Sequence, residues 1–222
     1  MRAGDDAIVF LDDDQTVPED WLAQLIRIWR DDGSDALKSN FVILPRHRYS
    51  EYDADTLQRL EQQLVSGRRE RKVRTLATNG VLIARRVFDE LGLRFDPNFA
   101  LTGGGDHEFF NRARVRGAKL ALTFEIVAFE WRSDDRRSLR ARMKRGFHLG
   151  VCSARLRHLK DRSAASLIGG GLWLVLSGLV ALPTAIFHRK KLGNVLKRAA
   201  KGFGYLAGLA GYRFQYYRTV TT

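Results

Sequence analysis

Residues 7–14 read Ala7-Ile8-Val9-Phe10-Leu11-Asp12-Asp13-Asp14, a short apolar run that leads directly into three carboxylates. An unbroken apolar run of this length is typical of a strand buried on both faces, as in a parallel sheet covered by helices. In such sheets the ligand site lies outside the carboxyl ends of the strands. The stretch therefore predicts an α/β fold with a functional site at residues 12–14.

Three adjacent carboxylates repel one another, so a site built from them favours a bound cation. Oxygen ligands suit Mg²⁺ or Mn²⁺, which keep several waters and bridge to the phosphates of a substrate. Asp12 and Asp14 are the predicted metal ligands. The alternative is a solvated acidic loop that caps the next helix, since Val17 to Trp21, with Pro18 in it, resembles a helix start.

Two blocks of the sequence resemble family 2 glycosyltransferases of the GT-A fold. The first, Phe10 to Asp14 followed by Pro18-Glu19-Asp20-Trp21-Leu22, is similar to the Asp-x-Asp region of that family. The second, Phe95-Asp96-Pro97 with Thr102 to Phe110, is similar to its acceptor-side motif, although Gly105 stands where the family usually has Glu. The resemblance covers about residues 5 to 150, and the later part is similar to bacterial exopolysaccharide (succinoglycan-type) transferases.

The resemblance implies a metal-dependent, inverting enzyme that moves a sugar from a nucleotide-diphosphate donor, in the first place a UDP-sugar, to a lipid-linked saccharide. It implies that Asp106 is the catalytic base; the alternative is that Asp106 only caps a helix. An inverting displacement needs no enzyme nucleophile. The residues expected to contact the donor are Asp13, Asn79, Gly80, Gly104, Gly105, Arg142 and Arg145.

Four of these expected donor residues also fit a second role. Asn79 and Gly80 interrupt an apolar stretch from Val73 to Ala84, which indicates either close approach of the backbone to a ligand or a bulge. Arg142 and Arg145 suit phosphate contacts, but they fit a basic collar at a membrane surface equally well.

The charge of the chain is unevenly distributed. The formal net charge is +13, and residues 136–222 hold 18 Lys and Arg with a single acid, Asp161. The same part contains an uncharged run from Ser163 to Phe187. Because nucleic-acid binding does not call for such an apolar run, the expected partner is an anionic membrane surface and not nucleic acid. We expect a protein of the cell inner membrane with its catalytic part in the cytoplasm. Cys152 is the single cysteine, so the chain can form no internal disulfide.

The expected organisation is a partial GT-A domain in residues 1–135, a basic juxtamembrane helix in 136–162, and hydrophobic membrane-associated helices with a basic, aromatic tail in 163–222. Basic residues flank the apolar run on both sides, which favours a re-entrant or interfacial hairpin over a simple span. The family places a nucleoside-binding strand and turn before the metal motif, so the resemblance implies an N-terminally truncated fold. An alternative function is a non-catalytic membrane-bound fragment or saccharide-binding remnant of such an enzyme.

Overall fold

The computed structural model describes residues 6–70, 73–100, 102–133, 138–158, 164–185 and 189–212. The chain forms two compact units. The first comprises Met1–Phe95 and Asp106–Asp134, and the second comprises Asp96–Gly105 and Asp135–Thr222. The second unit thus includes residues 96–105 as well as the basic and apolar part of the sequence. The expected aromatic tail, residues 213–222, lies outside the described residues.

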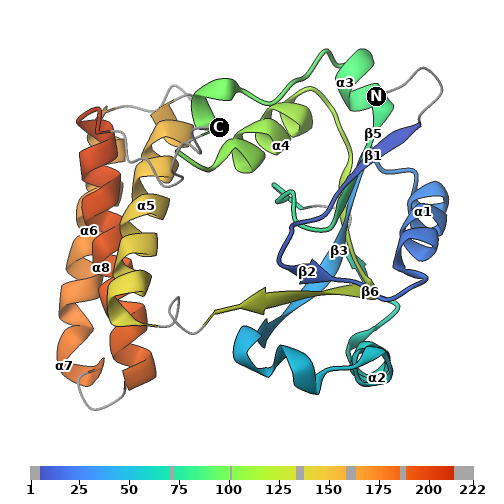
Figure 1. The fold of residues 1–222 in the computed structure, drawn as a ribbon. Helices are drawn as coiled ribbons and strands as arrows, with labels where there is room; N and C mark the ends of the chain where they lie inside the picture. The colour runs from blue at the N-terminus through green and yellow to red at the C-terminus, as the bar shows by residue number, and fades with distance from the viewer. Residues whose placement is uncertain are drawn as a thin grey trace, which may run out of the picture. The chain divides into compact units, whose positions relative to one another are not determined.

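The first unit is built on one mixed sheet with the strand order β1-β5-β3-β6-β2 (Figure 1). Its strands are β1 (Ala7–Phe10), β2 (Gln15–Thr16), β3 (Ala36–Pro45), β4 (Arg69–Glu70), β5 (Val81–Ala84) and β6 (Leu120–Arg132). β3 and β6 pair in parallel, and β5 pairs antiparallel with both β1 and β3. The short strands β2 and β4 pair antiparallel with β6.

The predicted α/β class with flanking helices is confirmed, and the sheet differs from the expectation in two respects. β1, β3 and β6 run in the same direction, as a mostly parallel sheet requires, but β5, β2 and β4 all pair antiparallel with these strands. Val81 to Ala84 are all buried, whereas Ala7 to Phe10 of β1, which were predicted to be buried on both faces, are only half-buried. An apolar run therefore indicates a strand but fixes neither its direction nor its place in the sheet. Within the described residues, β1 forms an edge of the sheet.

Helices cover both faces of this sheet. α1 (Trp21–Asp32) and α2 (Ala54–Leu64) pack on one face, where the 3₁₀ segment η1 (Arg46–Glu51) precedes α2. α3 (Arg85–Asp89) and α4 (Gly105–Val115) contribute Val87, Phe109 and Phe110 to a separate core cluster. α1 ends at Gly33, whose φ of 63° is the left-handed conformation that glycine adopts at a helix C-terminus.

The apolar stretch from Val73 to Ala84 is a strand only in its last four residues. Gly80 has a φ of 72°, and this left-handed conformation keeps the residues before it out of β5, which begins at the next residue. An added Cβ at Gly80 would lie 2.7 Å from Ser39 Oγ. Glycine is needed here because the turn passes directly over β3.

The second unit consists of η2 (Pro97–Phe99) and the helices α5 (Leu139–His158), α6 (Ala164–Val180), α7 (Leu182–Ala185) and α8 (Arg189–Leu209). Glycines let α6 and α8 approach closely, since an added Cβ at Gly178 would lie 2.9 Å from Ala199 Cβ and one at Gly202 would lie 2.6 Å from Val175 Cγ2. Among the described residues, no helix has both the length and the apolar character that crossing a membrane requires.

Candidate functional site

The three carboxylates of the opening stretch lie in a tight turn between β1 and β2. Gln15 closes this turn, because its backbone N–H donates to Asp12 O and its side-chain Oε1 accepts from Asp12 N, each at 3.1 Å. The backbone N–H of Trp131 donates to Asp14 O at 2.8 Å and fixes the turn to β6. α1 begins later, at Trp21, and its N-cap residue is Asp20. The acidic triplet therefore does not cap that helix.

Lys38 of β3 is a buried cation beside this turn. Its ammonium group donates to the backbone oxygen of Asn79 and, at 2.9 Å, to Asn79 Oδ1. Burial lowers the pKa of Lys38 to about 8, while the carboxylates of Asp12, Glu130 and Asp106 oppose that shift. The lysine thus lies in a common electrostatic field with three carboxylates that come from the end of β1, from β6 and from α4.

Burial, together with repulsion by neighbouring carboxylates, raises the pKa of Asp12. Loss of surrounding water is the largest cause, followed by the charges of Asp14 and Glu130, whereas Lys38 acts in the opposite direction. Glu130 is 7% exposed and is also paired with Arg132, whose Nε donates to it at 3.2 Å. The negative charge of the cluster is therefore only partly balanced by the protein's own cations.

Aromatic stacking connects the turn to α4. Phe10, at the end of β1, meets Phe95 edge to face with the ring centroids 5.7 Å apart. Phe95 stacks on Phe109 of α4 at 4.1 Å and 16°. The phenylalanine of the predicted Phe95-Asp96 motif therefore helps hold the helix that carries Asp106.

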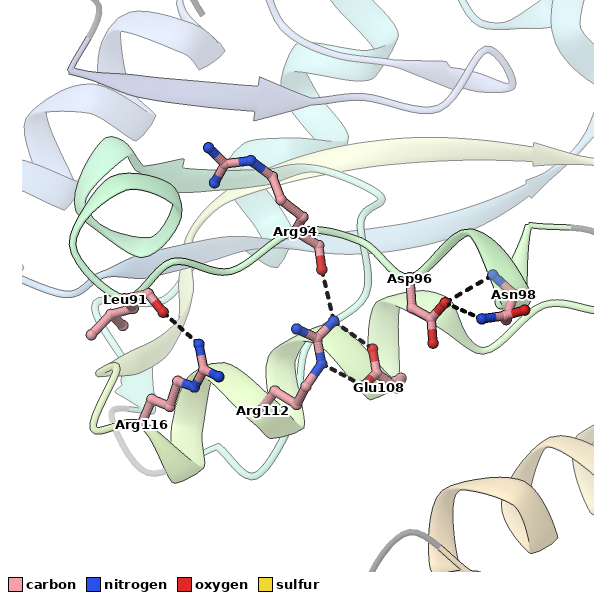
Figure 2. Close-up of polar contacts among 7 residues, drawn as sticks. All are labelled: Leu91, Arg94, Asp96, Asn98, Glu108, Arg112 and Arg116. Atoms are coloured by element: carbon pink, nitrogen blue, oxygen red, sulfur yellow. Dashed lines mark hydrogen bonds and ion pairs between the residues drawn. The ribbon is translucent and has the colours of Figure 1, made fainter.

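Ion pairs and backbone contacts fasten the rest of α4, as Figure 2 shows. The guanidinium of Arg112 pairs with Glu108 one turn earlier and donates to the backbone oxygen of Arg94 at 2.7 Å. Arg116 donates to the backbone oxygen of Leu91 at 2.6 Å. In the second unit, Asp96 Oδ1 accepts from the backbone and side-chain nitrogens of Asn98, both at 2.9 Å, and so begins η2.

Asp106 lies in the first turn of α4, which starts at Gly105. Its Oδ1 accepts a hydrogen bond from the backbone N–H of the next residue, His107, at 2.8 Å. An N-cap side chain would instead bond to a backbone N–H two or three positions later. The geometry therefore does not show a helix cap at Asp106. The charge of the Asp106 carboxylate acts on Lys38.

The remaining predicted donor residues fall into two groups. In the first unit, Asn79 accepts a hydrogen bond from Lys38. Gly80 allows its backbone to lie close to Ser39, a residue of the protein itself. Asp13 is exposed at the surface of the turn.

The other group belongs to the second unit. An added Cβ at Gly104 would lie 3.3 Å from Cys152 Cβ, and one at Gly105 would lie 3.1 Å from Phe99 Cβ. Arg142 Nη2 donates to Asn194 Oδ1 of α8 at 2.7 Å, and Arg145 is exposed on α5. The charge of Arg145 contributes to lowering the pKa of His148, although burial is the main cause of that shift.

The donor set of the turn suits a hard cation that takes few protein ligands. Within the described ranges, no three or more His, Cys, Asp or Glu side chains are grouped so as to hold a metal by themselves. Mg²⁺ is commonly held by one or two carboxylates together with substrate phosphates. Asp12 and Asp14 offer two such carboxylates, and a bound cation would offset both the burial of Asp12 and the repulsion it receives from Asp14 and Glu130.

Lys38 and Glu130 were not among the residues predicted from the sequence. Each is a charged residue inside a long strand that is largely apolar, between Leu37 and Ser39 in β3 and between Phe129 and Trp131 in β6. Charged side chains are almost never fully buried unless they are paired. That pattern is the signal by which the sequence could have marked both residues.

Comparisons with known proteins agree with the exopolysaccharide resemblance. The chain is 31% identical over 156 residues to the succinoglycan biosynthesis protein ExoM of Rhizobium meliloti (strain 1021). The match covers 68% of this chain and 48% of that protein, so the chain spans about half the length of this relative. No protein-family model matches the sequence.

Solved structures show a weaker likeness. A crystal structure of residues 1–349 of TarS from S. aureus aligns with 95% of this chain at 12% identity and a TM-score of 0.41, over 67% of that chain. The same protein in complex with UDP-GlcNAc aligns with 97% of this chain at 13% identity and a TM-score of 0.40, over 70% of that chain. A likeness at this level indicates nothing about activity.

Proposed function

We propose that this chain provides the catalytic carboxylates of a membrane-associated, inverting glycosyltransferase of family 2 type in bacterial polysaccharide biosynthesis. The donor is a nucleotide-diphosphate sugar, in the first place a UDP-sugar, and the acceptor is a lipid-linked saccharide. The observation that carries the proposal is that the carboxylates of Asp12, Glu130 and Asp106, from three separate elements, all act electrostatically on the buried ammonium of Lys38. The similarity to the succinoglycan biosynthesis protein supports the polymer as the setting.

Each residue of the cluster has a chemical task in this proposal. Asp12 and Asp14 would hold Mn²⁺ or Mg²⁺, which when bound would supply positive charge beside the leaving diphosphate. Asp106 accepts the proton of the attacking acceptor hydroxyl. Lys38 holds Asn79 in place and limits the repulsion among the carboxylates before the cation and the donor bind.

Cation-dependent nucleotide binding tests this assignment. We expect calorimetry to detect weak, cation-dependent UDP binding, which added Mn²⁺ should produce and chelation of the cation should abolish. Asp12→Asn and Asp14→Asn should remove the cation dependence, because each variant removes a predicted ligand. Asp13→Asn is the matched control and should have a smaller effect, since successive side chains near a strand end point in different directions. Unchanged UDP affinity in Asp14→Asn would contradict the metal assignment.

The features that support membrane association all belong to the second unit. Leu167 and Val175 of α6 are buried, whereas another side of the helix exposes large apolar side chains, namely Ile168, Leu172, Trp173, Leu176, Leu179 and Val180. Burying such a surface in the headgroup region of a bilayer is favourable, and the basic residues of α5 and α8 would add attraction to anionic lipids. We propose attachment to the cytoplasmic surface of the inner membrane through this side of α6.

Vesicle sedimentation tests the attachment. The chain should sediment with anionic phosphatidylglycerol vesicles and stay bound at high salt, because burial of apolar surface is not screened by ions. The double variant Leu172→Glu/Leu176→Glu should be released. Val115→Glu, which changes an exposed apolar residue of α4, is the control and should stay bound. Release of the unmodified chain by salt alone would contradict apolar attachment.

A further inference from the structure

The first unit contains a cavity of about 840 Å³ that the proposed reaction centre does not use. It is open to solvent on one side and is lined by the segment from β2 to the start of α1, by η1 and α2, and by β6. This volume lies in the range typical of small-molecule binding sites. All of the lining residues belong to the first unit, so the cavity is a property of that unit by itself.

One wall of the cavity is aromatic. Tyr49 and Tyr52 both meet Trp131 edge to face, with ring centroids 4.6 and 5.5 Å from that of the indole. Trp131 is 5% exposed and its Nε1 donates to Thr16 Oγ1 at 2.8 Å, which fixes the indole in the wall. Tyr49 is 56% exposed, so its ring is accessible at the surface.

The remaining lining is rich in carboxylates and amides. Gln24 comes from α1, and Gln58 and Gln62 come from α2. Glu61, also on α2, is 8% exposed and accepts a hydrogen bond from the backbone N–H of Val127 at 3.4 Å. Among the described residues that line the cavity, none is Lys, Arg or His.

This combination selects the chemistry of the occupant. A phosphate or nucleotide would meet carboxylates and, among the described lining residues, no Lys, Arg or His, and a lipid chain would remove water from the lining carboxylates and amides without giving them hydrogen bonds. A saccharide satisfies both walls, because its C–H faces pack against aromatic rings while its hydroxyls donate to carboxylates and accept from amides. We infer that this cavity is a binding site for a neutral oligosaccharide.

The cavity is distinct from the carboxylate cluster. Glu130 and Trp131 are consecutive in β6, so their side chains leave the strand on opposite sides. Glu130 acts on Asp12 and Lys38, whereas Trp131 lines the cavity. In the proposed transferase the cavity holds a part of the saccharide other than the reacting sugar. That role rests on the proposed function, but oligosaccharide binding does not.

The test is a titration of the full chain with maltotetraose and with cellotetraose, without cation or nucleotide, followed by calorimetry and indole fluorescence. We expect at least one of these neutral tetrasaccharides to bind. Tyr49→Ala and Gln62→Ala should each weaken binding roughly tenfold, because each removes one face or hydrogen-bonding group of the cavity. Gln63→Ala is the matched control, since Gln63 neighbours Gln62 on α2 but does not line the cavity, and it should bind as the unmodified chain does.

Several results would overturn the inference. The first is no binding of either tetrasaccharide at about 10 mM. The second is binding by Tyr49→Ala and Gln62→Ala that is as tight as binding by the unmodified chain. The third is binding of only a cationic glucosamine tetramer. The test is independent of the reaction centre, because Asp14→Asn should retain oligosaccharide binding and Tyr49→Ala should retain cation-dependent UDP binding. A failure of one assignment is therefore distinguishable from a failure of the other.

Discussion

The ammonium group of Lys38 lies 2.9 Å from the side-chain oxygen of Asn79. The contact joins the centre of β3 to the turn that precedes β5. It also places a positive charge, 6% exposed, where the carboxylates of Asp12, Glu130 and Asp106 act on it. Lys38 is thus an internal counter-ion at the position where the proposed function requires a divalent cation.

Cation affinity should consequently depend on the protonation of Lys38. Its lowered pKa of about 8 means that the ammonium repels a divalent cation at neutral pH and loses its charge as the pH rises above that value. We expect Mg²⁺ affinity to rise roughly tenfold between about pH 7 and about pH 9, as calorimetry can measure. Lys38→Met should bind Mg²⁺ more tightly at neutral pH and lose this dependence. Lys119→Met, at an exposed lysine, should retain it, and weaker Mg²⁺ binding by Lys38→Met would contradict the counter-ion role.

Asp12 should destabilise the cation-free fold at neutral pH. Its pKa in the folded state is raised above the ordinary value of 3.8, so the folded state binds protons more readily than the unfolded state. Stability therefore falls as the pH rises through this interval, and the full cost is present above the raised pKa. Asp12→Asn should melt at a higher temperature than the unmodified chain at neutral pH, and the difference should shrink as the pH falls toward 3.8. Thermal melts in chelator measure this, with Asp13→Asn as the control; a lower melting temperature for Asp12→Asn at neutral pH would exclude net repulsion in the turn.

Removing the carboxylate of Asp106 should lower both the turnover and the pKa of Lys38. As the proposed base, Asp106→Asn should lower turnover by about 10²-fold or more, with little effect on donor binding. Because the Asp106 charge raises the pKa of Lys38, the same variant should move that pKa further below about 8, as an NMR titration of the lysine side chain can show. His107→Gln, at the exposed neighbouring residue, is the control for both readouts. Near-normal turnover in Asp106→Asn would reject the base assignment, whereas an unchanged Lys38 titration would reject the electrostatic contact.

Two glycines with similar backbone angles should respond differently to alanine. Gly80 and Gly92 have φ values of 72° and 60°, so Ala at either position should cost about 1 kcal/mol in the free energy of unfolding. Only at Gly80 would the added Cβ also collide with Ser39 Oγ, since nothing lies within 4 Å of the Cβ position at Gly92. We expect Gly80→Ala to cost about 1–3 kcal/mol more than Gly92→Ala. Urea denaturation of the first unit provides the comparison, and equal costs would show that β3 yields to the added methyl group.

The elements that depend on local sequence pattern were predictable. The apolar residues from Trp21 to Ile28 have the spacing of the amphipathic helix that α1 forms, Leu57 and Leu60 have the same spacing in α2, and glycines precede the start of α4. Residues 12–14 were predicted to follow a strand at a functional edge, and they do follow β1. Periodicity and turn chemistry are short-range properties, so one sequence contains the information for them.

The sequence by itself determined which residues form the acidic turn and which apolar faces must be buried. Only the tertiary structure decided what surrounds that turn, because Asp12, Glu130 and Asp106 come from separate elements and act on Lys38 only through strand pairing and helix packing. The same is true of the cavity, whose wall joins Tyr49 of η1 to Trp131 of β6. The direction of β5 and the tight turn at Gly80 also follow from packing. Burial and charge proximity depend on neighbours distant in the chain, and no local pattern specifies which neighbours those are.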